Sequence, residues 1–178
     1  MVIVIGGYVY MKVKHIALYG LFLALAVIAN YIEHLIPIPF IYPGVKLGLA
    51  NAVGLIVLYY LGRKSYATFG ILRVLLSAVL FTGFGSTFMI ALGGTIVATI
   101  FTIIVCSVTK ASIYGISATG AVFHGLGQVL VVSILYGTIQ MMWYMLILVV
   151  SGAITGVLMA IVTSLLISKL PKRLLINR

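Results

Sequence analysis

The chain has 178 residues, of which 64% are hydrophobic and 7% charged. Its mean hydropathy is +1.34, which excludes an ordinary soluble domain, since soluble chains carry roughly 25% charged residues. The sequence contains eleven Lys and Arg residues but a single acidic residue. We expect these basic residues to flank membrane spans rather than to bind nucleic acid.

Apolar runs interrupted by Pro, Gly and charged residues predict an all-α polytopic membrane bundle in one domain, 1–178. A helix that spans the hydrocarbon core needs about 20 residues, so about six helices use nearly the whole chain. In chain order the predicted helices are 15–35, 46–61, 66–82, 87–108, 116–136 and 139–168. Residues 1–11 have two open interpretations, a genuine segment or an over-extended N-terminus before a natural start near Met11.

The distribution of basic residues predicts that both termini are cytoplasmic. With the N-terminus inside, nine of the eleven basic residues fall on one side of the membrane, as the positive-inside rule requires. The nine are Lys12, Lys14, Arg63, Lys64, Lys110, Lys169, Lys172, Arg173 and Arg178. The exceptions are Lys46, at the outer start of the second helix, and Arg73, inside the third.

Charged residues away from the cytoplasmic ends are candidate site residues, because they are costly in a membrane and usually face a cavity, a partner or a pathway. Arg73 either extends toward the cytoplasmic interface or faces the bundle and binds an anionic group. Glu33 and Lys46 flank the Pro-rich connection between the first two helices. They either form a surface ion pair or frame the mouth of a substrate cavity with segment 36–45 as its lid.

Three uncharged polar residues inside predicted helices complete the candidate substrate-binding set. His124 and Gln128 are four residues apart and therefore share one face of the fifth helix, which indicates a cavity lining. Asn51 either binds substrate or only forms a hydrogen bond to a neighbouring helix.

Small residues at a spacing of four mark helix faces that can approach closely. Gly20 and Ala24 form such a patch on the first helix, and Gly152 and Gly156 form another on the sixth. Each is an expected surface for a second copy or a partner.

The residues needed for several chemistries are missing from the sequence. The only acidic residue is Glu33, so paired-carboxylate catalysis is excluded and Mg²⁺-assisted diphosphate chemistry is not expected. Three scattered His and one Cys offer no convincing metal site. We therefore expect no catalytic residues, no metal and no cofactor.

Four segments stand out as a set: residues 33–39 (EHLIPIP), residues 43–51 (PGVKLGLAN), Leu72-Arg73, and residues 112–121 (SIYGISATGA) leading to His124 and Gln128. Together they resemble the bacterial membrane family labelled heptaprenyl diphosphate synthase component I, also called the Gx transporter family. The resemblance covers nearly all of residues 14–170, and the specific part is the string PGVKLGLAN.

This family is similar to the substrate-binding S components of energy-coupling-factor (ECF) vitamin transporters. The resemblance implies six helices in the bacterial plasma membrane, a pocket open to the outside under the first connection, and two partner ATPases with a T component. S components often dock the T component through an Ala-xxx-Ala face on the first helix, which Gly20 and Ala24 approximate here.

Three functions remain open at this point. The first is an S-component-like subunit that binds a small vitamin-like or amphipathic molecule through Glu33, Lys46, Asn51, Arg73, His124 and Gln128. The second is a non-catalytic membrane accessory subunit of prenyl diphosphate or quinone synthesis. The third is a stand-alone carrier, for which the chain offers few groups to couple an ion.

Overall fold

In the computed structural model, the described part of the chain is a bundle of long helices. The structure describes residues 2–35, 47–137 and 143–170, with side chains from residue 13 onward except that of His34. The predicted lid 36–45, Lys46 and the predicted start of the last helix at 139 therefore lie outside the described residues.

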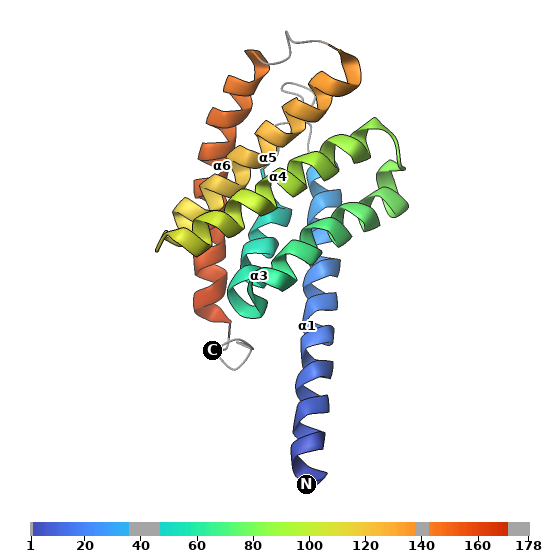
Figure 1. The fold of residues 1–178 in the computed structure, drawn as a ribbon, viewed down its shortest axis with the longest axis vertical. Helices are drawn as coiled ribbons and strands as arrows, with labels where there is room; N and C mark the ends of the chain where they lie inside the picture. Colours follow the sequence, from blue (N-terminus) through green and yellow to red (C-terminus); the bar gives the residue numbers. More distant parts are fainter. Residues whose placement is uncertain (1, 36–46, 138–142, 171–178) are drawn as a thin grey trace.

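The helices follow one another in the order α1, α3, η1, α4, α5 and α6 (Figure 1). Their bounds are Val2–Leu35 for α1, Leu49–Ser77 for α3, Ala78–Thr82 for the π-helical η1, Ser86–Val108 for α4, Ile113–Tyr136 for α5 and Tyr144–Lys169 for α6. Five helical segments among the described residues are long and apolar enough to cross a membrane. The prediction of an all-helical membrane bundle is thus confirmed, while the count of six spans stays a prediction.

One glycine divides α3 into two limbs. Gly62 has φ 86° and ψ 178°, which lies outside helical geometry, and the chain reverses direction there (Figure 1). A positive φ strains any residue with a Cβ, so glycine is the residue that fits this turn. The limb before Gly62 and the limb after it correspond to the predicted second and third helices, and the expected linker up to residue 65 is replaced by this single non-helical residue.

Several helix ends differ from the predicted ones for identifiable reasons. Helix α5 begins at Ile113 rather than 116 because the Ser112 side chain accepts a hydrogen bond from the Gly115 backbone N–H at 3.4 Å, as an N-cap does. The third predicted helix ends where expected, since η1 stops at Thr82 and Gly83 follows with φ 68°.

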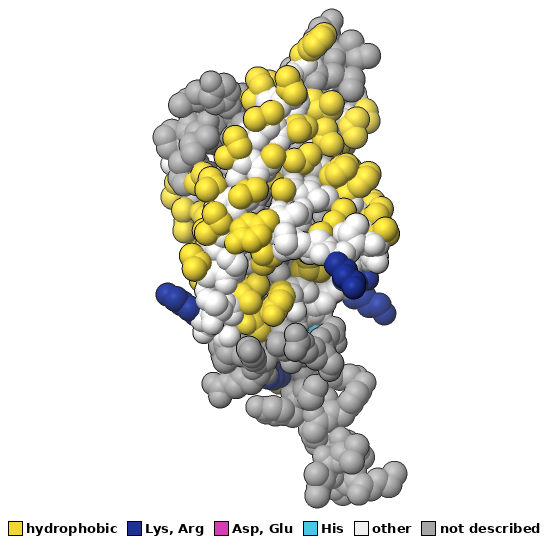
Figure 2. Space-filling view, turned by 90° about the vertical axis from the view of Figure 1, so that its left-hand side faces the viewer, with side chains coloured by type: hydrophobic (Ala, Val, Ile, Leu, Met, Phe, Trp, Pro, Cys, Tyr) yellow, Lys and Arg dark blue, Asp and Glu magenta, His cyan; other side chains and the backbone are white. Residues whose placement is uncertain are grey.

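An aromatic and aliphatic core joins α1 to α3. Phe22 and Ala26 of α1 pack against the buried side chains of Tyr60, Leu61 and Phe69 around the Gly62 turn. Large apolar side chains elsewhere point outward, and on the face shown in Figure 2 they form a broad band with Lys and Arg at its lower edge. A protein with this band and these helices is membrane-embedded.

We call the end of the bundle that carries Arg63, Lys64, Lys110 and Lys169 the basic end. The described N-terminus of α1 and the end of α6 both point toward it (Figure 1). The first residues of α3 and the last residues of α1 lie away from it, and the candidate site lies beside them.

Candidate functional site

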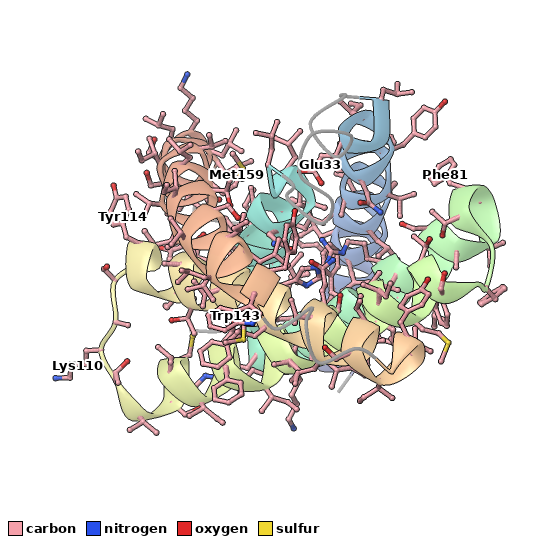
Figure 3. All side chains as sticks on the ribbon, turned by 90° about the horizontal axis from the view of Figure 1, so that it is seen from above. Glu33, Phe81, Lys110, Tyr114, Trp143 and Met159 are labelled. Atoms are coloured by element: carbon pink, nitrogen blue, oxygen red, sulfur yellow. The ribbon has the colours of Figure 1, made fainter. Side chains whose placement is uncertain are left out.

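A cavity of about 80 Å³ lies among α1, both limbs of α3, α4, α5 and α6. Viewed from above, Glu33 and Met159 lie toward the centre of the bundle, whereas Lys110 and Phe81 lie at its edges (Figure 3). The polar residues that line the cavity are Asn30, Glu33, Asn51, Arg73, His124, Gln128, Ser151 and Thr155. Five of the six predicted binding residues are in this set, and the sixth, Lys46, is outside the described residues.

Glu33 joins the end of α1 to the start of α3. Its side chain is 6% exposed, and its Oε1 accepts a hydrogen bond of 2.6 Å from the backbone N–H of Leu49, the first residue of α3. A carboxylate is favourable there because the first N–H groups of a helix lack helical partners and carry partial positive charge. Part of its negative charge is therefore committed to holding the two helices together.

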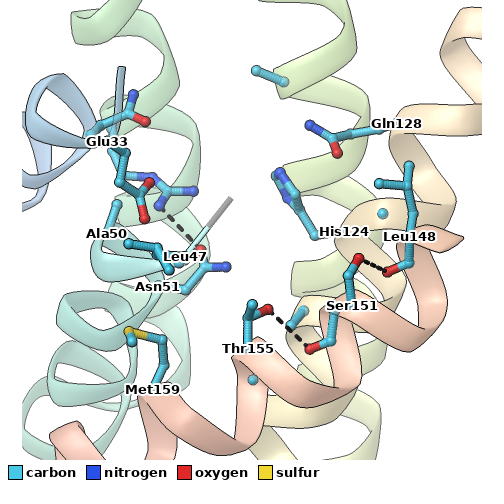
Figure 4. A pocket seen from close by; sticks show the side chains of 18 of the residues that line it. Glu33, Leu47, Ala50, Asn51, His124, Gln128, Leu148, Ser151, Thr155 and Met159 are labelled. Atoms are coloured by element: carbon cyan, nitrogen blue, oxygen red, sulfur yellow. Dashed lines mark hydrogen bonds between the residues drawn. The ribbon is translucent and has the colours of Figure 1, made fainter. Parts of the chain in front are cut away.

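Arg73 turns into the bundle, so the alternative in which it extends toward the cytoplasmic interface is wrong. The guanidinium is half-buried and donates from Nη1 to Oδ1 of Asn51 at 3.2 Å. Asn51 stands on the first limb of α3 and Arg73 on the second, so this bond links the two limbs across the cavity wall (Figure 4). A guanidinium has five N–H donors, and this hydrogen bond uses one of them.

His124 and Gln128 of α5 line the wall opposite Glu33 and Asn51 (Figure 4). Gly94 of α4 makes room for both: a Cβ at this position would lie 2.9 Å from Cγ of Gln128 and 3.0 Å from Cε1 of His124. The predicted shared face of these two residues is confirmed, and it faces a cavity as expected.

Three further polar residues of the wall were not among the predicted binding residues. Ser151 and Thr155 of α6 face the cavity, where their hydroxyls donate to Leu148 O at 3.2 Å and Gly152 O at 3.3 Å (Figure 4). Asn30 of α1 donates to Ser77 Oγ at 2.9 Å. The signal for the α6 pair was the spacing of four that places them beside Gly152 and Gly156.

A second cavity of about 20 Å³ adjoins the first, because Asn51, Arg73 and His124 line both. Thr95 of α4 also lines it, and its Oγ1 is buried without a hydrogen-bond partner among the described residues. The volume exceeds the roughly 10–15 Å³ that one water needs. A single water there would satisfy Thr95 and lie beside Arg73.

The two predicted small-residue patches have different surroundings. Gly20 and Ala24 are exposed, and no atom lies within 4 Å of a Cβ built on Gly20, so this face of α1 is open within the chain. Gly152 and Gly156 instead pack on α5: a Cβ on Gly156 would lie 2.8 Å from Cα of Ala118. The expectation that this second patch serves a partner is wrong, since it closes the chain's own bundle.

The chemistry that this site offers is recognition. One guanidinium, one carboxylate, one imidazole and three amides surround a small space inside an apolar bundle. Fixed polar groups in apolar surroundings orient a ligand strongly, since a partner group that fails to match them costs free energy.

A family model described as heptaprenyl diphosphate synthase component I matches residues 22–166 of the chain. No curated protein and no solved structure matches it. The matched range contains every described residue of the cavity wall.

Proposed function

We propose a function for this chain on the premise that it belongs to the heptaprenyl diphosphate synthase component I family, the family that the match over residues 22–166 shows. The chain acts as a membrane-embedded subunit that binds a small vitamin-like or amphipathic molecule with an anionic group. Partner ATPases and a T-type membrane subunit energise its uptake.

The observation that carries this proposal is the position of Arg73. Its guanidinium lies in a cavity wall inside an apolar bundle, with Asn51 as its one hydrogen-bonded side chain in the described residues. A cation at such a place is costly unless it meets an anion. Glu33 acts on Arg73 electrostatically, but no hydrogen bond joins the two among the described residues, and Glu33 Oε1 accepts from the Leu49 N–H. An anionic ligand group would give the Arg73 guanidinium a direct charged partner.

The size of the cavity restricts how the ligand sits. Pockets for drug-sized molecules occupy about 300–1,000 Å³, whereas this one measures about 80 Å³. The cavity therefore receives a compact polar head such as a carboxylate, with the remainder of the ligand outside it. His124 and Gln128 would hydrogen-bond the head from the α5 side.

A second candidate function follows from the family's description, which names a synthase component. In that function the chain is a non-catalytic membrane accessory of a soluble prenyl diphosphate synthase. With Glu33 as the only acidic residue, the metal-binding carboxylates of such a reaction would have to come from the partner.

One experiment separates the two candidates. The tagged protein is purified from its native membranes in mild detergent, and its bound proteins and small molecules are identified by mass spectrometry. Recovery of ATPases, a T-type subunit and an anionic small molecule is the expected result. Recovery of a soluble prenyl synthase without ATPases would refute uptake and favour the accessory function.

Two substitutions then test the cavity. Asn51→Ala and His124→Ala should each lose the co-purified molecule while keeping the elution profile of the folded protein. Lys110→Ala, at the edge of the bundle (Figure 3), is the control and should keep it. Normal retention by both cavity variants would show that the ligand binds elsewhere.

A further inference from the structure

A larger hollow lies at the basic end, away from the two cavities beside Arg73. It measures about 1,210 Å³ and is lined by α1, the Gly62 turn of α3, the end of α4, the start of α5 and the end of α6. We call it the basic-end groove. Nothing in the proposed uptake of a small molecule uses it.

The lining of the groove combines two kinds of surface. Apolar side chains from three helices, among them Leu58, Ile116 and Ile167, form its walls, while Arg63 and Lys64 lie at the Gly62 turn. The Arg63 guanidinium is held in place: it donates to Ser107 Oγ at 2.9 Å and to Cys106 O at 3.1 Å. Lys64 is exposed.

No acidic side chain lies among the described residues that line the groove. Glu33 is the only acidic residue of the sequence, and it is bonded to Leu49 N beside the other cavity. No acidic side chain of this chain is therefore available to neutralise Arg63 and Lys64. A free inorganic anion would bind the two cations but make no contact with the apolar wall beside them. A molecule that joins an anion to a hydrocarbon chain can contact both.

We propose that the basic-end groove binds an anionic phospholipid, with its phosphodiester at Arg63 and Lys64 and an acyl chain along the apolar wall. The level of the groove supports a lipid over an acidic protein segment, since the Lys and Arg side chains visible in Figure 2 lie where the apolar band ends. Headgroups lie at this level of a bilayer, and basic pockets between helices at the cytoplasmic side recognise them.

The test is native mass spectrometry of the full-length protein in detergent, with equal amounts of dioleoyl phosphatidylglycerol and dioleoyl phosphatidylcholine. The wild type should retain phosphatidylglycerol preferentially. Arg63→Gln with Lys64→Gln should lower this retention about thirtyfold, since each of the two cations near a charged headgroup contributes about 1 kcal/mol. Lys64→Gln alone should give part of the loss, which covers the case that removing Arg63 disturbs the turn.

The matched control removes the same charge outside the groove. Lys110→Gln with Lys169→Gln takes two exposed cations from the same end, neither of which lines the groove, and should keep the preference. Equal losses in the two double variants would show general surface attraction and overturn the proposal. Absence of any lipid preference in the wild type would overturn it as well.

A third variant tests the apolar wall without changing charge. Ala111 lines the groove, and Ala111→Trp should block the acyl chain and lower phosphatidylglycerol retention. Excess glycerol 3-phosphate should not displace the lipid, because it carries the phosphate without the acyl chain. Full displacement by it, or full retention in Ala111→Trp, would mean an anion site only and contradict a lipid site.

Discussion

At the scale of single residues, Arg73 determines what the cavity can bind. A cation inside an apolar bundle needs an anion or several hydrogen-bond acceptors, and Asn51 supplies one acceptor at 3.2 Å. Because Asn51 must keep its Oδ1 toward Arg73, its amide N–H groups point elsewhere and are available to a ligand. The pair therefore offers a positive group and a neutral donor side by side.

Replacing Arg73 by Gln should weaken binding of the co-purified anionic molecule by about 2–5 kcal/mol, which is a factor of roughly thirty to several thousand. Arg73→Lys keeps the charge but loses the planar fork, so it should fall between Gln and the wild type. Ligand retained by the purified protein, quantified by mass spectrometry, measures this. Arg63→Gln, at the opposite end of the molecule, should leave the cavity ligand unchanged, and unchanged retention in Arg73→Gln would contradict the assignment.

Glu33 should act on stability more than on binding. Removing its acceptor in Glu33→Ala leaves the N–H of Leu49 unsatisfied, at a cost of about 0.5–2 kcal/mol for a lost helix cap. Glu33→Gln keeps an acceptor oxygen and should lose less. Thermal unfolding in detergent should rank the unfolding temperatures as wild type, then Gln, then Ala. A Gln variant of wild-type stability that no longer binds ligand would instead mean that the carboxylate contacts the ligand.

The candidate site was predictable from the sequence where polar residues interrupt apolar helices. Asn51, Arg73 and His124 stood out by their cost in a membrane, and the structure places all three around one cavity. Ser151 and Thr155 did not stand out, because a hydroxyl in a membrane helix usually bonds to its own backbone, as both do here. The hydrogen bond from Leu49 N to Glu33 joins positions sixteen residues apart, and no local sequence pattern predicts it.

At the scale of helices, glycine sets how closely α4, α5 and α6 approach. A Cβ at Gly127 of α5 would lie 2.8 Å from both the Gly93 carbonyl oxygen and Gly94 Cα of α4. Both are backbone atoms, so they cannot move aside as a flexible side chain can. The same close approach brings His124 and Gln128 to the cavity.

Gly127→Ala should therefore destabilise the protein, by about 1–3 kcal/mol as overpacked interiors typically do. Gly20→Ala is the matched control on an open helix face, and it should be neutral or stabilise by up to about 1 kcal/mol through helix propensity. Thermal unfolding of the two variants in detergent measures this: Gly127→Ala should unfold at a lower temperature than Gly20→Ala. Equal behaviour would mean that α4 and α5 are not packed as closely as described.

The sequence predicted the presence of each described helix more accurately than the residues at which the helices end or the helices against which they pack. Long apolar runs identified the helices because nothing but a helix satisfies the backbone in lipid. The predicted start at 116 is three residues late, because the apolar pattern does not mark the cap that the Ser112 side chain forms with the Gly115 N–H. The spacing of Gly152 and Gly156 indicated close packing correctly, but a spacing alone does not say whether the packed helix belongs to the same chain.

At the scale of the whole molecule, the uneven distribution of charge predicts the orientation. Arg63, Lys64, Lys110 and Lys169 gather at the basic end, and the cavity with Arg73 in its wall lies away from it. If the basic end is cytoplasmic, as the positive-inside rule predicts, the cavity lies toward the outside of the cell, where an uptake protein must collect its ligand.

This orientation can be tested with single cysteines, since the chain has one native Cys, Cys106. In a Cys106→Ser background, Phe84→Cys lies on the exposed turn before α4 and Lys110→Cys on the exposed turn after it. A membrane-impermeant maleimide added to intact cells should label position 84 and not position 110. Labelling of position 110 alone would reverse the orientation and with it the direction of uptake.

The turn at Gly62 makes α3 a hinged pair of helical limbs. Asn51 lies eleven residues before Gly62 and Arg73 eleven residues after it. Each of the two residues is therefore about 16 Å from Gly62 along its own limb. A rotation of one limb by about 10° about Gly62 would move Asn51 and Arg73 apart by about 3 Å. That is enough to break the hydrogen bond between them. Arg63, beside this turn, donates hydrogen bonds to Ser107 and to the Cys106 carbonyl of α4. In the proposed function, a displacement of α4 at the basic end would therefore change the separation of Asn51 and Arg73 at the ligand.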